Sequence, residues 1–352
     1  MAYTSIDKSS DYINTVLYNG TGNSTAVTGV GFQPDWVWVK CRSSGGSNSY
    51  AHVITDVVRG VNETLFSNET DGEVANHAKG YLSAFGTDGF TVTGEDGTSA
   101  SGQTYVSWNW LAGGSASNNT TGDITASVSA NATAGFSIGS YNTSAMGSAS
   151  STYTIGHGLS SAPTMVIVKP YSTSDDWYVY HQALGNAKYI RLNTDSASTS
   201  NSNTWGSTSP TSSVFSINTT FWGVNSIQSV FYAFADVKGY SKMGSYTGNG
   251  STNGTFSYTG FKPSWIMIKY EGTEDWNMYD NKRNTFNIVG QQLKANTNAA
   301  ETDNEDILDF LSNGFKLRTT RSRANGSGLK YIYAAFAENP FVTSTGIPSP
   351  AR

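Results

Sequence analysis

The sequence predicts an all-β protein built from three tandem antiparallel β-sandwich-like modules of about 100 residues each. Two observations come from composition. Charged residues make up only 13% of the chain, so its polar surface consists mainly of Ser, Thr, Asn and Gly, which favour turns and strands over surface helices. Aromatic residues also make up 13%, and they suit a pleated, half-buried sheet. The third observation is a motif that occurs three times.

The motif consists of a Pro, one further residue, four apolar residues and a Lys, at residues 34–40, 163–169 and 263–269. Pro fits the start of a strand, where its missing N–H breaks no ladder hydrogen bond. The apolar run is too short for a helix, so we expect a strand that is buried on both faces. We expect the lysine at the end of each run to mark the point where the strand enters solvent: Lys40, Lys169 and Lys269.

Each copy of the motif is followed, after several short strands and turns, by an aromatic strand at residues 105–110, 230–235 or 331–337. Short strands separated by turn signals are typical of a small sandwich or barrel. If the copies share one fold, the first apolar residue of each run is buried at a matched position: Trp36, Met165 and Trp265.

The repeats divide the chain into predicted domains. The β modules cover residues 1–112, 134–240 and 241–341. A stretch rich in Gly, Ser, Asn and Thr, residues 113–133, is interpreted as a linker or long loop. Residues 342–352, which contain two prolines, are expected to form an extended tail.

Several strings in the second and third copies resemble a repeated domain of unknown function found in virion proteins of marine phages. These phages infect cyanobacteria and other abundant ocean bacteria. The strings lie at residues 177–181, 192–193, 244–252, 260–263 and 335–341, and the first copy departs most from the pattern. The resemblance implies a phage structural protein, often labelled as a tail or fibre protein, and it brings no catalytic residues.

Charge and composition argue against several classes of partner. The formal net charge is -5, the pI is about 5.4, and Lys and Arg form no cluster, so we expect no nucleic-acid partner. No apolar stretch has the length of a membrane span, and the N-terminus lacks the apolar core of a signal peptide. We therefore expect assembly in the cytoplasm of a host bacterium, with no membrane insertion. The single cysteine, Cys41, excludes an intrachain disulfide.

A few residues match catalytic or metal-binding patterns only in part. Ser137 lies in a Gly-x-Ser-x-Gly string like a nucleophile elbow, but no helix pattern follows it. The histidines have no partner at metal-ligand spacing and are expected on the surface or in turns: His52, His77, His157 and His181.

An acidic run near residues 304–311 has two interpretations. Its carboxylates could ligate Ca²⁺, but the spacing lacks the EF-hand pattern. Acidic residues also stabilise a helix N-terminus, and residues 304–311 are the predicted helix, so we expect a capping role. The run consists of Glu301, Asp303, Glu305, Asp306 and Asp309.

Two pairs of residues recur between the second and third copies. Asp176 and Asp275 could form a glycosidase pair, but recurrence at one module position fits turn residues more simply. Trp177 and Trp276 could stack on sugar rings, and the same recurrence favours packing inside the sheet.

These observations predict a non-enzymatic phage virion protein with no catalytic residues, no metal site and no cofactor. We expect a tail fibre or appendage component that contacts the host surface, because the predicted modules form an elongated string. Its expected partners are other virion proteins, further copies of itself, and a host-surface glycan or receptor. The alternatives are a capsid decoration, cement or head-fibre protein, and a glycan-binding or glycan-degrading tail module.

Overall fold

The computed structural model describes residues 4–43, 50–147, 149–303 and 306–340. Within these ranges the chain forms antiparallel β-sheets, two 3₁₀ turns and one short α-helix. The all-β fold class predicted from the sequence is therefore confirmed. The predicted tail at residues 342–352 lies outside the described residues.

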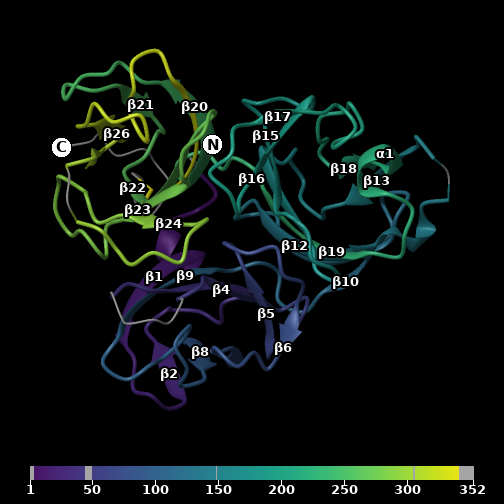
Figure 1. Ribbon diagram of the computed structural model, residues 1–352, viewed down its shortest axis with the longest axis horizontal. Coiled ribbons are helices and arrows are strands. Elements are labelled where there is room, and N and C mark those ends of the chain that lie inside the picture. Colours follow the sequence, from purple (N-terminus) through teal and green to yellow (C-terminus); the bar gives the residue numbers. More distant parts are fainter. Residues whose placement is uncertain (1–3, 44–49, 148, 304–305, 341–352) are drawn as a thin grey trace.

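The first segment of the chain, residues 4–112, folds into two sheets, drawn in purple to blue in Figure 1. Its elements are η1 (Ser9–Asp11), β1 (Ile13–Asn19), β2 (Thr25–Thr28), β3 (Trp36–Cys41), β4 (Val53–Asp56), β5 (Glu63–Phe66), β6 (Val74–Ala75), β7 (Leu82–Gly86), β8 (Gly89–Val92) and β9 (Thr104–Trp110). The larger sheet has the order β1-β9-β3-β4-β5-β6, and the smaller sheet has the order β2-β8-β7. Side chains from both sheets share one buried cluster, so the pair forms a sandwich.

The second segment, residues 113–240, also has a large and a small sheet. Its elements are β10 (Ser117–Asn119), β11 (Ala126–Asn131), β12 (Phe136–Asn142), η2 (Thr143–Ala145), β13 (Thr152–Gly156), β14 (Met165–Pro170), β15 (Tyr178–His181), β16 (Lys188–Arg191), β17 (Thr199–Ser200), β18 (Val214–Asn218), α1 (Thr219–Trp222) and β19 (Gln228–Phe234). The large sheet has the order β10-β11-β12-β19-β14-β15-β16-β17, and β13 pairs with β18.

The linker predicted at residues 113–133 is wrong. Strand β11 pairs with β12 over its whole length, and β10 extends the same sheet. Ile124, Ala126 and Val128 are buried in the core of the second segment. Tertiary packing of these few apolar residues therefore makes strands of a stretch whose composition is typical of a loop.

The third segment, residues 241–340, repeats the arrangement with a five-stranded and a three-stranded sheet. Its elements are β20 (Ser241–Thr247), β21 (Phe256–Tyr258), β22 (Pro263–Tyr270), β23 (Asn277–Asp280), β24 (Leu293–Lys294), β25 (Leu308–Leu311), β26 (Gly314–Leu317) and β27 (Lys330–Ala337). The sheets have the orders β20-β27-β22-β23-β24 and β21-β26-β25. The helix predicted at residues 304–311 is wrong where the chain is described, because β25 pairs with β26 and buries Leu308 and Phe310.

The strand of each Pro motif is buried on both faces, as predicted. Its apolar residues alternate between two cores, since side chains in a strand point to opposite faces in turn. The second and fourth residues of each run pack into the core of their own segment. The first and third pack into one cluster shared by all three segments: Trp36, Trp38, Met165, Ile167, Trp265 and Met267.

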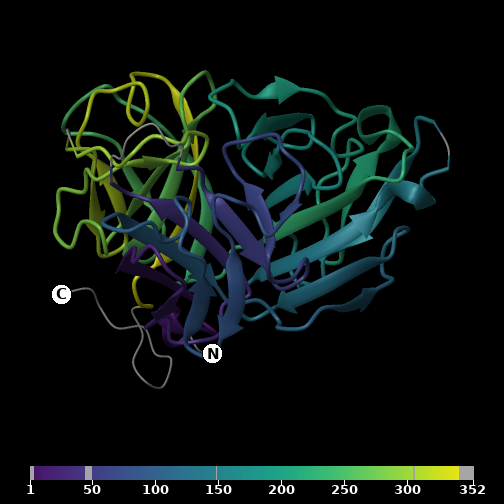
Figure 2. The same ribbon diagram turned by 60° about the horizontal axis from the view of Figure 1, so that its bottom comes forward.

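Aromatic rings from the three segments meet at the centre of this shared core. The Trp36 ring stacks on Tyr232 with ring centroids 4.6 Å apart, and the Trp110 ring meets Trp265 edge-on at 5.5 Å. Figure 1 shows the segments as three lobes around a common centre, and in Figure 2 the first segment comes forward between the other two. The expected elongated string of modules is therefore wrong, because the segments bury one another's sheets.

Strand register makes the three Pro motifs equivalent. Strands β3 and β14 each begin two residues after the motif proline, and β22 begins at it. In each case the first apolar residue faces the same position of the aromatic strand: Trp36 pairs with Trp110, Met165 with Phe234 and Trp265 with Phe336. The predicted burial of these first apolar residues at matched positions is confirmed.

Candidate functional site

The lysine that ends each Pro motif is buried, contrary to the expected exit into solvent. We call Lys40, Lys169 and Lys269 the junction lysines; each is 0% exposed. Each one donates hydrogen bonds to carbonyl oxygens of its own segment and of a neighbouring segment. The motif therefore identified these lysines as equivalent, but the prediction that they enter solvent is wrong.

The acceptors in the neighbouring segment lie at one equivalent position. Lys40 Nζ is 3.2 Å from the carbonyl oxygen of Asn298, and Lys169 Nζ is 2.9 Å from that of Thr70. Lys269 Nζ is 3.2 Å from the carbonyl oxygen of Asp195. Each acceptor stands two residues after an Asn that itself lies two residues beyond the end of a short strand, β24, β5 or β16. The first segment thus contacts the third, the second contacts the first, and the third contacts the second, which closes a ring.

Carbonyl oxygens suit an ammonium group because it has three N–H donors and no acceptor. Lys269 Nζ also lies 2.6 Å from the carbonyl oxygen of Gly272 and 2.8 Å from that of Tyr270, so three acceptors surround it. Burial nevertheless lowers the pKa of each junction lysine to about 8. At neutral pH the lysines therefore remain charged, and they hold backbone loops of two segments together.

A second set of donors occupies another equivalent position in each segment: His52, Trp177 and Trp276. The Trp177 indole donates to the carbonyl of Phe66 at 3.0 Å, and the Trp276 indole donates to that of Arg191 at 2.7 Å. His52 Nε2 lies 2.9 Å from the carbonyl oxygen of Lys294. The predicted packing role of both tryptophans is confirmed, since they are 0% and 2% exposed and offer no face to a sugar.

Each of these donors is held by an Asn side chain of its own segment. The backbone N–H groups of His52, Trp177 and Trp276 donate to Oδ1 of Asn68, Asn193 and Asn296 at 2.8–3.0 Å. Burial lowers the pKa of His52 well below its ordinary value, with a further contribution from the charge of Lys40. His52 is therefore neutral: its Nδ1 accepts from the Trp38 indole at 2.8 Å while Nε2–H donates across the junction.

Backbone hydrogen bonds complete each junction. The N–H of Glu73 donates to the carbonyl of Tyr171, and the N–H of Ser198 donates to that of Glu271. The N–H of Glu301 donates to the carbonyl of Arg42. Each acceptor stands two residues after a junction lysine, so the same geometry occurs three times.

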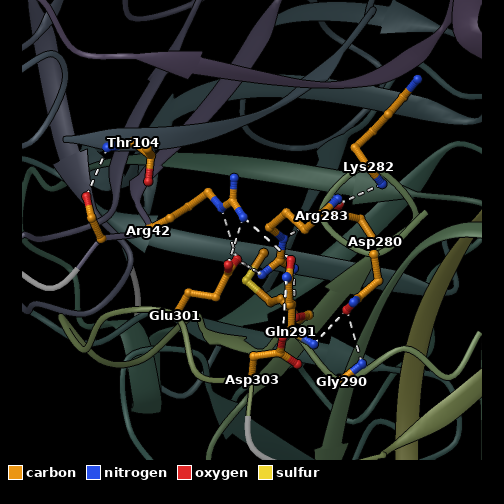
Figure 3. Close-up of polar contacts among 12 residues, drawn as sticks. Arg42, Thr104, Asp280, Lys282, Arg283, Gly290, Gln291, Glu301 and Asp303 are labelled. Atoms are coloured by element: carbon orange, nitrogen blue, oxygen red, sulfur yellow. Dashed lines mark hydrogen bonds and ion pairs between the residues drawn. The ribbon is translucent and has the colours of Figure 1, made fainter. Parts of the chain in front are cut away.

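A buried ionic network strengthens the junction between the first and third segments, as Figure 3 shows. Arg283 Nε lies 2.6 Å from Asp280 Oδ2, and Arg283 Nη1 lies 3.0 Å from Glu301 Oε2. Arg42 of the first segment pairs with Glu301 at 2.8 Å. The indole of Trp108, also from the first segment, donates to Asp280 Oδ2 at 3.0 Å. Charged groups removed from water are therefore matched by opposite charges and hydrogen bonds.

The junction between the first and second segments has a similar network, with Tyr171 at the position of Arg42. Arg59 pairs with Asp56 at 2.7 Å and with Glu73 at 3.0 Å, and the hydroxyl of Tyr232 donates to Asp56 Oδ2 at 2.8 Å. Burial alone would lower the pKa of Arg59, but the neighbouring carboxylate of Asp56 raises it above its ordinary value. The guanidinium therefore stays charged inside the protein.

At the junction between the second and third segments, neutral residues replace the aspartate and the arginine in the described part of the chain, and the ion pair found there, Lys188 with Glu271 at 3.5 Å, is partly exposed. His181 stands at the position of the aspartate, Leu184 at that of the arginine, and Ala334 at that of the aromatic donor. His181 Nε2 lies 3.3 Å from the carbonyl oxygen of Tyr333, and its Nδ1 accepts from the N–H of Ala183. Burial lowers the pKa of His181 to about 4, so the ring is neutral.

The remaining sequence candidates lie apart from the junctions or play other roles. Ser137 is buried as the second residue of β12, and η2 follows that strand. Asp176 pairs with Arg191, and Asp275 pairs with Lys294, each beside the Asn that anchors a tryptophan. Cys41 is buried as a free thiol.

The expected surface position is wrong for three of the four histidines, because His52, His157 and His181 are buried, while His77 is half-buried. His157 lies between the carbonyl of Thr211 and the N–H of Leu159.

Where the structure describes it, the acidic run does not cap a helix. Glu301 belongs to the ionic network, and Asp309 in β25 pairs with Arg318. Asp303 accepts a hydrogen bond from Gln291, Asp306 is exposed, and Glu305 lies outside the described residues. In the described part of the chain, no group of three or more His, Cys, Asp or Glu side chains is placed to hold a metal ion.

Among the residues that the structure describes, no helix has both the length and the apolar character needed to cross a membrane.

Sequence reasoning missed the two buried arginines. A signal was present, because Asp56 and Arg59 have the same Asp-x-x-Arg spacing as Asp280 and Arg283. In both cases the aspartate also accepts the backbone N–H groups of the turn that follows it. The spacing therefore indicates a turn closed by an ion pair, although it does not reveal the partner segment.

Together these contacts define an all-β protein in which three antiparallel sheets share one core and lock together through buried polar groups. The chain belongs to the family of the domain of unknown function DUF7483, whose family model matches residues 8–340. A single family model therefore covers all three segments. No curated protein and no solved structure matches the chain.

Proposed function

We propose that this protein is a non-enzymatic structural component of a phage particle, most simply the compact end of a tail fibre or other appendage that contacts the host surface. The observation that carries the proposal is the closed ring of junctions. The acid, base and ammonium groups that recur in the segments are used to hold the sheets together. Such an arrangement favours a rigid building unit over a catalyst.

The shape of the chain and the sequence resemblance support the proposed position on the particle. The resemblance to virion proteins of marine phages supports a place in the particle. A fibre shaft requires an elongated fold, whereas three segments around one core form a compact unit, which suits the end of an appendage. The same compactness also favours a second candidate, a capsid decoration or cement protein.

The low charge of the chain supports assembly with other virion proteins and with further copies of itself. Charged residues make up 13% of the sequence, and protein interfaces are depleted in Lys, Glu and Asp and enriched in aromatic residues. A surface of Ser, Thr and Asn side chains loses less hydration free energy than a charged surface when a partner covers it.

Gold-labelled antibodies against the protein, imaged by electron microscopy on purified particles of a phage that encodes it, test this proposal. Label at the tip of the tail or of an appendage is the expected result, and label spread over the capsid supports the decoration protein. Purified particles that carry no label and contain none of the protein by mass spectrometry would overturn both.

The non-enzymatic part of the proposal has its own test. Purified protein is incubated with envelope polysaccharide from the host, and released reducing ends are measured. We expect no release. Release that Asp176→Asn or Asp275→Asn abolishes would show that one of these carboxylates is catalytic.

A further inference from the structure

A pocket of about 380 Å³ opens where the second and third segments meet. Its lining includes Asp236 and Lys238 from the turn between the segments, Lys242 from β20, Tyr258 at the end of β21 and Thr259 directly after it. The volume lies within the range of roughly 300–1,000 Å³ that small-ligand sites occupy. The pocket lies outside the polar junctions described above.

Tyr258 is an aromatic side chain that the fold leaves uncovered. It is 63% exposed, and Phe256, two residues earlier on the same face of β21, is 44% exposed. Strand register places Tyr258 opposite Gly314, which matches Thr28 opposite Gly89 in the first segment and Gly156 opposite Val214 in the second. The fold therefore forms without an aromatic residue at this position, and packing does not explain Tyr258.

The charged groups of the pocket are arranged around a fixed carboxylate. Asp236 accepts from Lys242 Nζ at 2.6 Å, from the Thr164 hydroxyl at 2.9 Å and from the N–H of Met243 at 2.8 Å. Its oxygens are thus engaged with protein donors. The Lys242 side chain remains 40% exposed and keeps further N–H donors for a ligand.

The pocket is also more cationic than the protein as a whole. Two lysines and one aspartate line it, in a chain whose formal net charge is -5. Burial tends to lower the pKa of Lys242, but the carboxylate of Asp236 raises it above the ordinary value, so the ammonium persists at neutral pH. A ligand that matches these features has a ring face for Tyr258 and a negative charge for the lysines.

We propose that this pocket binds an acidic saccharide, whose ring stacks on Tyr258 and whose carboxylate contacts Lys242. The exposed aromatic ring, the pocket volume and the two lysines each contribute to this assignment. The inference rests on the proposed function and deepens it, because it names a class of host-surface ligand.

Isothermal titration of the full chain with trigalacturonate, and with the neutral galactotriose of the same linkage, tests the proposal. We expect trigalacturonate to bind at least about tenfold more tightly, the difference that one charge-assisted hydrogen bond supplies. Tyr258→Ala should weaken the binding of trigalacturonate by about tenfold. Lys242→Gln should remove the preference for the acidic sugar.

Phe286→Ala is the matched control, because Phe286 is 83% exposed and lies outside the pocket lining. This variant should bind as the parent chain does. Absence of trigalacturonate binding, equal affinity for the two trisaccharides, or unchanged binding by Tyr258→Ala would overturn the proposal. The titration uses isolated protein and the gold labelling reports only position on the particle, so failure of one proposal is distinguishable from failure of the other.

Discussion

Two of the three junctions contain a buried aspartate–arginine pair, and in the described part of the third junction neutral residues take its place. Asp280 and Arg283 of the third segment receive the indole of Trp108 from the first segment. At the corresponding place in the second segment stand His181 and Leu184. There the neighbouring segment presents the backbone carbonyl of Tyr333, which accepts from His181.

The difference teaches that these residues act as a set. An Asp at the position of His181 would be a buried carboxylate with no arginine beside it, and Arg at the position of Leu184 would be a buried cation with no carboxylate. The aromatic donor is also absent where the aspartate is absent, because Ala334 stands in its place. A polar set and a mostly neutral set therefore occupy equivalent junctions without leaving a buried charge unpaired.

The largest expected effect comes from removal of one partner in the polar set. Asp280→Ala leaves Arg283 without its closest carboxylate and leaves the Trp108 indole without its acceptor. We expect a loss of about 3–5 kcal/mol in the free energy of unfolding, because a buried cation loses the closer of its two carboxylates and buried N–H donors lose their acceptor. Urea denaturation followed by tryptophan fluorescence measures this loss.

Asp11→Ala is the control for that experiment. Asp11 pairs with Lys8 at 2.6 Å, but both side chains are exposed, so the pair contributes about 0–1 kcal/mol. Equal losses for the two variants would contradict a special role for the buried network.

The neutral set, which consists of His181, Leu184 and Ala334, predicts that the free energy of unfolding depends on pH. Burial lowers the pKa of His181 to about 4 in the folded protein, and an unfolded chain has a histidine pKa near 6.5. The stability that depends on neutral His181 is therefore complete above pH 6.5 and is lost as the pH falls toward 4. The pKa difference corresponds to about 3 kcal/mol.

His181→Gln isolates this contribution, because an amide can donate to the carbonyl of Tyr333 and accept from Ala183 without titrating. The free energies of unfolding of the parent chain and of the variant are measured from pH 7.5 to 4. Their difference should change across that range, and a constant difference would show that His181 does not titrate as described.

The sequence was informative wherever contacts are local. The alternation of apolar residues in β3, β14 and β22 follows from strand geometry, so burial on both faces could be predicted from a few neighbouring residues. The partner of a junction lysine could not be predicted in this way, since Lys40 and the carbonyl of Asn298 are separated by 258 residues. A lysine after an apolar run normally enters solvent, and only the neighbouring segment changes that outcome.

The two errors of secondary structure have a related cause. The stretch at residues 113–133 contains few apolar residues, and those few pack onto a sheet formed by later residues. The acidic run before Leu308 resembles a helix start, but Leu308 and Phe310 are buried in the core of the third segment by pairing with β26. In both places tertiary packing outweighed local preference.

A transplant of the neutral set into the polar junction sharpens the comparison. The double variant Asp280→His/Arg283→Leu copies the residues of the second segment and leaves no unpaired charge. We therefore expect it to lose about 1–3 kcal/mol, less than Asp280→Ala alone. The same urea titration measures this, and a double variant as unstable as the single one would show that the residues do not act as a set.

The smallest expected effect comes from removal of the indole N–H donors that occupy equivalent positions in the second and third segments. Trp276→Phe keeps most of the buried ring but removes the indole N–H that donates to the carbonyl of Arg191 at 2.7 Å. We expect a loss of about 1–2 kcal/mol, because that carbonyl loses a hydrogen-bond partner inside the protein. Trp177→Phe removes the matching bond to Phe66 and should cost a similar amount. Trp265→Phe is the control, since the Trp265 indole N–H has no hydrogen-bond partner among the described residues and the change removes only ring contacts. A larger loss for Trp265→Phe than for both other variants would show that ring packing, and not the junction hydrogen bonds, determines how tightly the three segments hold together.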